Sequence, residues 1–161
     1  MRLRWQDAPM ATIKDQLQSD LSTAMKARDE LRSGTIRMVL AAITNEEVSG
    51  KQARELSDDD VMTVLGREAK KRREAAEAYD DAGRGELANT ERAELAVIEE
   101  YLPEQMSDDE LNAIIDAAVA EVAGSGAEGG KAMGAVMKIV QPKVKGRADG
   151  SVVATRVKAA L

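Results

Sequence analysis

The chain has 161 residues, a formal net charge of −6, and neither cysteine nor histidine. The two missing residue types exclude disulfides, thiol nucleophiles, Cys/His zinc sites and imidazole general bases. Phenylalanine is also absent, so the core has to be built from Leu, Ile, Val, Ala and Met. That composition, with abundant Glu, Lys and Arg, favours an all-α fold. No apolar run approaches the ~20 residues of a membrane span, and we expect a cytoplasmic protein without a cofactor.

Residues 1–9 show no helical period, and we expect a disordered extension there. Residues 10–102 hold four stretches with apolar residues at helical spacing, which predict a four-helix, bundle-like N-terminal domain. The expected helices are 12–28, 31–48, 57–81 and 86–102. The first is expected to bury Ile13, Leu17, Leu21, Ala24 and Met25. The clearest helix start is Ser57 with the three aspartates after it, because a hydroxyl cap then precedes carboxylates at the positive end of the helix dipole.

Pro103 marks the expected domain boundary, because the residue before a proline avoids helical geometry. The run from Ser107 to Glu110 repeats the start signal seen at Ser57 and predicts another helix. A flexible linker at 124–130 follows, and then a short helix, a basic loop and a last helix. Residues 103–161 are therefore predicted to form a small three-helix tail domain.

The segment 129–161 concentrates positive charge. It holds seven Lys or Arg residues and one acid, a net charge of +6, so the rest of the chain carries −12. Lys131, Gly134 and Lys138 follow each other at helical spacing, and a glycine between two lysines leaves bare backbone that a phosphate can approach closely. The candidate phosphate-binding residues are Lys131, Gly134, Lys138, Lys143, Lys145, Arg147 and Ser151.

Two interpretations of this segment stay open. In the first, the cations and the N-terminus of the last helix bind phosphates. No aromatic residue lies nearby to stack on bases, so the contacts would be to backbone and shape. In the second, the segment is a solvated basic surface, and Gly130 and Gly134 let two helices approach closely.

A second basic run spans Arg67 to Arg73. Its cations advance about 100° each around a helix, so they do not all face one ligand. Ion pairing is the favoured interpretation, with Arg72 as a candidate for an interhelical ion pair. A secondary nucleic-acid contact through Lys70, Lys71 and Arg73 is the minor alternative.

Two other patterns are set aside. The stretch Ser125–Ala132 resembles a phosphate-binding P-loop, but serine replaces its first glycine and Ala132 replaces its magnesium-binding hydroxyl residue. The aspartates at 58–60 stand at a helix start, where carboxylates usually complement the helix dipole. They also lack the alternating spacing of a calcium loop. We therefore predict no nucleotide hydrolysis and no metal site.

Four segments together resemble the YqeY family. They are TIRMVLAAITNEEV, REAKKRREAAEAY, ELAVIEEYLPEQMSDDEL, and MGAVMK followed by PKVKGRADGSVV. The resemblance covers residues 10–161. It implies a small bacterial all-helical protein with an N-terminal bundle and a three-helix tail. One departure is Ala135, which stands where the family is expected to carry a lysine after the Met-Gly pair.

The YqeY family is similar to the C-terminal part of GatB, the B subunit of the tRNA-dependent amidotransferase. In GatB this tail is a mobile appendage that holds tRNA, and similar domains are appended to some glutaminyl-tRNA synthetases. The resemblance therefore implies tRNA as a partner. It does not carry over the chemistry, because the catalytic part of GatB is its N-terminal kinase-like region, which has no counterpart here.

Three functions are compatible with these observations. The first is a non-catalytic tRNA-binding adaptor linked to tRNA-dependent amidation or aminoacylation. The second is an accessory or catalytic subunit of a carbon–nitrogen ligase that uses glutamine as amido-nitrogen donor. The third is a protein-interaction module that docks an aminoacyl-tRNA synthetase or an amidotransferase.

Overall fold

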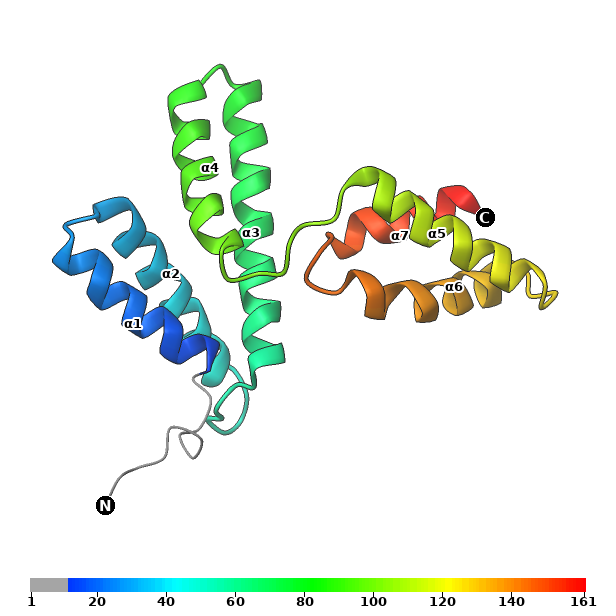
Figure 1. The fold of residues 1–161 in the computed structure, drawn as a ribbon, viewed down its shortest axis with the longest axis horizontal. Coiled ribbons are helices and arrows are strands. Elements are labelled where there is room, and N and C mark those ends of the chain that lie inside the picture. The colour runs from blue at the N-terminus through cyan, green and yellow to red at the C-terminus, as the bar shows by residue number, and fades with distance from the viewer. Residues whose placement is uncertain (1–11) are drawn as a thin grey trace, which may run out of the picture. The chain divides into compact units, whose positions relative to one another are not determined.

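The computed structural model describes residues 12–161, and every regular element between them is an α-helix, which confirms the predicted fold class (Figure 1). The helices in this range are α1 (Ile13–Lys26), α2 (Glu30–Glu47), α3 (Asp58–Asp81), α4 (Gly85–Glu99), α5 (Asp108–Ala123), α6 (Gly129–Val144) and α7 (Gly150–Ala160). The extension expected at residues 1–9 lies outside the described residues. None of the helices between residues 12 and 161 is both long and apolar enough to cross a membrane.

The chain divides into two compact units, the first ending at Tyr101 and the second running from Leu102 to Leu161. We call the described part of the first unit, with α1–α4, the body, and the second unit, with α5–α7, the tail. In the body α1 lies beside α2 and α3 beside α4, and the two helix pairs meet mainly through α2 (Figure 1). The core of the body consists of aliphatic side chains, the largest fully buried ones being Leu17, Ile36, Ile43, Leu65 and Ile98.

Two of the predicted helix starts are capped as their sequences indicate. The Ser57 hydroxyl accepts a hydrogen bond from the N–H of Asp60, and the Asp60 carboxylate accepts one from the N–H of Ser57 in return. This reciprocal arrangement satisfies two N–H groups that have no partner inside the helix. At the start of α5 the Ser107 hydroxyl accepts from the N–H of Glu110 at 3.2 Å. Both predicted starts are confirmed.

One expected core residue is on the surface. Met25 is 51% exposed, although the sequence predicts it in the buried stripe of the first helix. Leu17 and Ala24 are buried, and at 100° per residue they lie within about 20° of each other around α1. Met25 is turned a further 100° from Ala24 and stands in the last turn of the helix, which ends at Lys26. The stripe that α1 buries is therefore narrower than predicted.

A buried ion pair joins α3 to α4. Arg72 Nη1 lies 2.6 Å from Glu68 Oε2 on the same helix, and Arg72 Nε lies 3.4 Å from Glu94 Oε2 on α4. The Arg72 side chain is only 8% exposed. The interhelical ion pair predicted for Arg72 is thus confirmed, and α2 contributes to the same site because Arg72 Nη2 donates to the sulfur of Met38 at 3.7 Å.

The pKa values of the two carboxylates in this network, Glu68 and Glu94, are shifted in opposite directions. Burial acts to raise the pKa of Glu68, but hydrogen bonds from Lys71 and Arg72 outweigh it, so the pKa lies below its ordinary value. Burial raises the pKa of Glu94, and Arg72 only partly offsets that effect. Arg72 therefore keeps negative charge in a site that would otherwise disfavour it.

We expect Arg72→Met to destabilise the body by about 3–5 kcal/mol, because two largely buried carboxylates lose their common partner. The measurement is the free energy of unfolding in urea. Arg67→Met is the matched control, since Arg67 on the same helix is 60% exposed and pairs with Glu46 at 3.3 Å. An exposed pair is worth about 0–1 kcal/mol, and an equal loss in both variants would contradict the role given to Arg72.

Candidate nucleic-acid interface

The apolar face of α6 lies at the centre of the hydrophobic core of the tail. Val136, Val140 and Val144 of α6 are buried together with Val153 and Val157 of α7. Leu111, Ile115, Ala118 and Val122 complete this core from α5. Val136 and Val140 are fully buried, and Met133 and Met137 of the same helix are half-buried. The opposite face of α6 is consequently turned to solvent.

Three of the candidate residues share that solvent-facing side. At 100° per residue, Lys131, Gly134 and Lys138 lie within about 60° of one another around α6, and the two lysines are about 10 Å apart along its axis. All three residues are exposed. In the part of the chain that the structure describes, no carboxylate pairs with either of these two ammonium groups. The structure thus brings together two uncompensated positive charges and a stretch of backbone without a side chain.

Gly134 is not needed for helix packing. A Cβ added at Gly134 would meet no atom within 4 Å, and the same holds at Gly130. The interpretation that these two glycines let helices approach closely is therefore wrong. The bare backbone at Gly134 is open to solvent and lies between the two lysines.

Lys143 stands on a different side of the same helix. The sequence predicts it in a loop, but α6 continues through Pro142 to Val144. The proline removes only the hydrogen bond that its N–H would have donated to the carbonyl of Lys138, near the end of the helix. Lys143 is turned by about 140° from Lys138, so it does not share the face of Gly134. Lys145 follows as the C-cap, and its N–H donates to the carbonyl of Gln141 at 3.0 Å.

Arg147 and Ser151 are engaged within the tail. Arg147 Nε donates to the carbonyl of Glu104 at 2.9 Å, and its Nη2 lies 3.1 Å from Glu110 Oε2. The N–H and the hydroxyl of Ser151 both donate to the carboxylate of Asp149 at 2.8 Å. An anion at the start of α7 would have to compete with this carboxylate. The acid at the N-cap therefore makes that helix start a poor phosphate site.

The start of α6 differs from that of α7. Its N-cap residue Glu128 makes no side-chain cap, and no acid stands in the first turn. The N–H groups of this turn are therefore not satisfied by the N-cap side chain. This open helix start is not among the predicted site features, although Gly-Gly-Lys without a preceding Ser, Thr, Asp or Asn cap is the sequence signal for it. Because Glu128 is itself negatively charged, this turn adds less to anion binding than the lysine face.

The cations of the second basic run, Lys70, Lys71 and Arg73, form ion pairs with glutamates. Lys71 Nζ lies 3.0 Å from Glu68, Lys70 Nζ lies 4.0 Å from Glu74, and Arg73 Nη2 lies 3.6 Å from Glu99. Arg73 pairs in this way with a glutamate of α4. These contacts favour the ion-pair interpretation of Lys70, Lys71 and Arg73 over a secondary nucleic-acid contact.

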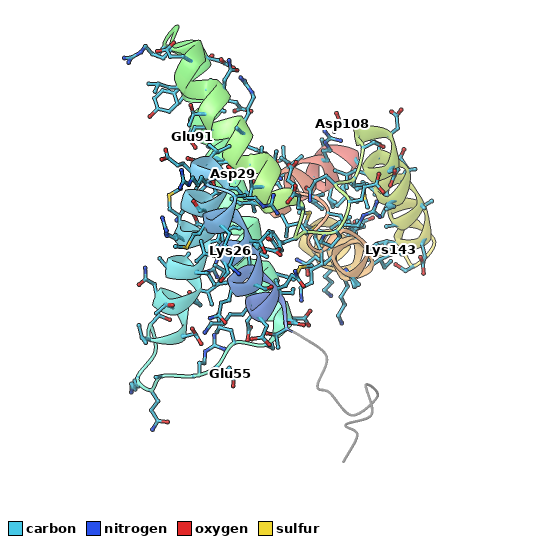
Figure 2. All side chains as sticks on the ribbon, turned by 60° about the vertical axis from the view of Figure 1, so that its left-hand side comes forward. Lys26, Asp29, Glu55, Glu91, Asp108 and Lys143 are labelled. Atoms are coloured by element: carbon cyan, nitrogen blue, oxygen red, sulfur yellow. The ribbon has the colours of Figure 1, made fainter. Side chains whose placement is uncertain are left out.

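The charges of the tail are separated between its helices. α5 carries five acids and no base, whereas α6 and α7 together carry only bases. Asp108, at the start of α5 in Figure 2, pairs with Arg156 of α7 at 2.7 Å. A polyanion is therefore repelled by the acids of α5 and attracted by the exposed cations of α6 and α7.

The body offers no comparable site. A hollow of about 470 Å³ lies between the end of α2 and the loop before α3. Lys14 and Glu47 in its lining pair with each other at 2.8 Å, and Arg54 pairs with Asp60 at 3.1 Å. Among the residues from 12 to 161, no cluster of acidic side chains is arranged to hold a metal ion.

We expect Gly134→Ala to stabilise the tail by about 0.5–1 kcal/mol, because alanine restricts the unfolded chain and its Cβ meets no neighbour. The measurement is thermal unfolding followed by circular dichroism. Gly146→Ala is the control, since Gly146 has φ 74°, where a side chain is strained. Destabilisation by Gly134→Ala would show that Gly134 is packed after all.

Comparison with known proteins gives the family. The sequence model of the family described as Yqey-like protein matches residues 14–161. Three similar proteins, from Meyerozyma guilliermondii, Pyrenophora tritici-repentis and Vanderwaltozyma polyspora, share the name "Altered inheritance of mitochondria protein 41, mitochondrial". Their identities to this chain are 33% over 96 residues, 27% over 146 and 35% over 89, respectively.

The matches differ in extent. They cover 60%, 89% and 53% of this chain, in the same order, and 47%, 77% and 46% of the three relatives. The chain thus spans about half the length of two of them. The relatives are fungal proteins named as mitochondrial, so the expectations of a bacterial origin and a cytoplasmic location stay predictions. The similarity to GatB likewise stays an expectation.

Proposed function

This chain belongs to the YqeY-like family, and on that premise we propose that it is a non-catalytic adaptor whose tail binds the phosphate backbone of tRNA. The observation that carries the proposal is the exposed face of α6 formed by Lys131, Gly134 and Lys138. We call these three residues the lysine face. Its two ammonium groups have no acidic partner among the described residues, so a phosphate would meet no competing carboxylate there.

The chemistry of the lysine face suits a phosphate backbone better than bases. The tail contains no aromatic residue, so it has no platform on which an unpaired base could stack. Gly134 allows an oxygen to come close to the helix backbone between the two cations. Contacts of this kind recognise the shape and charge of a folded RNA rather than its sequence.

The affinity should be modest and strongly dependent on salt. The whole chain carries a net charge of −6, which opposes a polyanion, so attraction has to come from local cations such as those of the lysine face. Such a surface avoids indiscriminate binding to nucleic acid, as an adaptor needs. The choice of tRNA among folded RNAs rests on the resemblance to the tail of GatB.

The adaptor role is preferred to that of a catalytic subunit. The chain has no cysteine for a thiol glutaminase and no histidine as general base. Among the described residues, those with the clearest pKa shifts belong to ion pairs or hydrogen bonds of the body, as Glu68 and Tyr101 do. A role in tRNA-dependent amidation would therefore require catalytic groups from a partner such as an amidotransferase or a synthetase.

We expect the double substitution Lys131→Gln with Lys138→Gln to lower the slope of log K against log salt for tRNA binding by about 1.4–1.8, since each phosphate contact contributes about 0.7–0.9. Fluorescence anisotropy with a labelled tRNA at several salt concentrations measures the slope. The affinity at low salt should fall with it.

The matched control is Lys26→Gln with Lys51→Gln. Both of these body lysines are exposed and have no acidic partner within residues 12–161, so the control changes the net charge by the same amount. Its slope should equal that of the unchanged chain. Equal slopes in all three proteins would refute phosphate binding by the lysine face, and equal reductions in both variants would indicate an effect of net charge alone.

We also expect Gly134→Leu to weaken tRNA binding while the tail stays folded. A Cβ at this position meets no atom within 4 Å in the free protein, and the leucine side chain would occupy the place where a phosphate oxygen approaches the backbone. Anisotropy titration gives the affinity, and circular dichroism gives the helix content. Unchanged affinity would show that the backbone at Gly134 takes no part, whatever the lysines do.

A further inference from the structure

Side-chain contacts hold the chain on the body up to Tyr101, the last residue of the body. Arg32 Nη1 of α2 lies 2.7 Å from Glu100 Oε2, directly after the end of α4. The hydroxyl of the next residue, Tyr101, donates a hydrogen bond to the carboxylate of Asp20 on α1. Two side chains that follow α4 are therefore held by two other helices of the body, and the chain cannot fray back from this point without breaking both contacts.

The chain is anchored again almost immediately on the tail. The N–H of Met106 donates to the carbonyl of Arg147 at 2.8 Å, and the side-chain amide of Gln105 donates to the carbonyl of Gly146 at 3.0 Å. Arg147 closes the arrangement by donating to the carbonyl of Glu104 at 2.9 Å. The segment 104–106 is thus fastened to the loop between α6 and α7, some forty residues further along the chain.

Arg147 makes the central contacts of this arrangement. Its guanidinium reaches the carbonyl of Glu104 and the carboxylate of Glu110, and its own carbonyl accepts from Met106. A planar group with several donors suits such simultaneous contacts, which a lysine cannot reproduce. Gly146 supports the loop with φ 74°, a conformation that glycine adopts without strain.

Only Leu102 and Pro103 lie between the two anchored stretches, and the carbonyl of Pro103 accepts a hydrogen bond from the side-chain amide of Gln105 at 3.3 Å. Proline fixes its own φ and restricts the preceding residue to extended conformations. The side chain of Leu102 is also buried, although its backbone makes no hydrogen bond in the described chain. Very few backbone torsions are therefore free to turn at this junction.

We propose that Arg147 is a clasp that limits the connection between body and tail to a two-residue hinge at Leu102 and Pro103. The term clasp covers the contacts of Arg147 with Glu104, Met106 and Glu110. Arg147 is then a positioning residue rather than a phosphate ligand, because a phosphate would have to take the guanidinium from Glu110 and loosen the linker. This role does not depend on RNA binding.

The experiment measures the spread of distances between body and tail without any RNA. The chain lacks cysteine, so the pair Ser22→Cys and Ala117→Cys, both at exposed positions, introduces unique sites for nitroxide labels. Pulsed electron spin resonance then gives the distance distribution. Arg147→Gln removes the side-chain contacts to Glu104 and Glu110 but keeps the backbone hydrogen bond of Met106 and the contact of Gln105 with Gly146. The flexible segment should therefore grow from two residues to about three, and the width about 1.2-fold, since the reach of a flexible segment scales with the square root of its length.

Lys143→Gln is the matched control, because it removes the same charge from the end of α6, where the described chain offers Lys143 no partner. Its distribution should keep the parent width. Gln105→Ala removes one contact between the linker and the loop and should widen the distribution by less than Arg147→Gln. The proposal is overturned if Arg147→Gln matches Lys143→Gln while circular dichroism shows both folded. A parent distribution already as wide as that of Arg147→Gln would overturn it equally.

Discussion

Burial of the valine face of α6 determines which side chains of that helix are exposed to solvent. Val136, Val140 and Val144 recur every four residues along α6 and pack with α5 and α7. Because these valines lie along one side of α6, their packing turns Lys131, Gly134 and Lys138 on the other side outward together. The lysine face is thus a consequence of the hydrophobic core beneath it, and each substitution that shifts this core also shifts the candidate site.

The use of cations differs between arginine and lysine in the tail. Both of its arginines, Arg147 and Arg156, bridge elements and contact the segment before α5 or α5 itself. Lys131 and Lys138 are left without an acid in the described structure. Guanidinium groups suit fixed multidentate contacts, and ammonium groups on flexible stems suit adaptable contacts to phosphate. The tail therefore separates cations that hold the fold from cations available to a partner.

The body contributes stability and negative charge rather than a site. Arg72 joins α3 to α4 through largely buried carboxylates, and most other charges of α3 pair on the surface. The net negative charge of the chain leaves the lysine face as a local exception in an acidic protein. In the adaptor role that we propose, RNA would bind to one side of one helix, and the acidic body would be available to a protein partner.

The sequence by itself determined the helical fold, the capped starts at Ser57 and Ser107, and the grouping of Lys131 with Gly134 and Lys138. These depend on spacing and on residues within one turn of each other, which are local properties. Tertiary structure alone decided which of the predicted cations have partners. The contact of Arg147 with Glu110 joins residues far apart in the sequence, and no local pattern reports such a pairing. The loop expected at Lys143 was likewise helix, because burial of Val140 and Val144 on one face outweighs the hydrogen bond lost at Pro142.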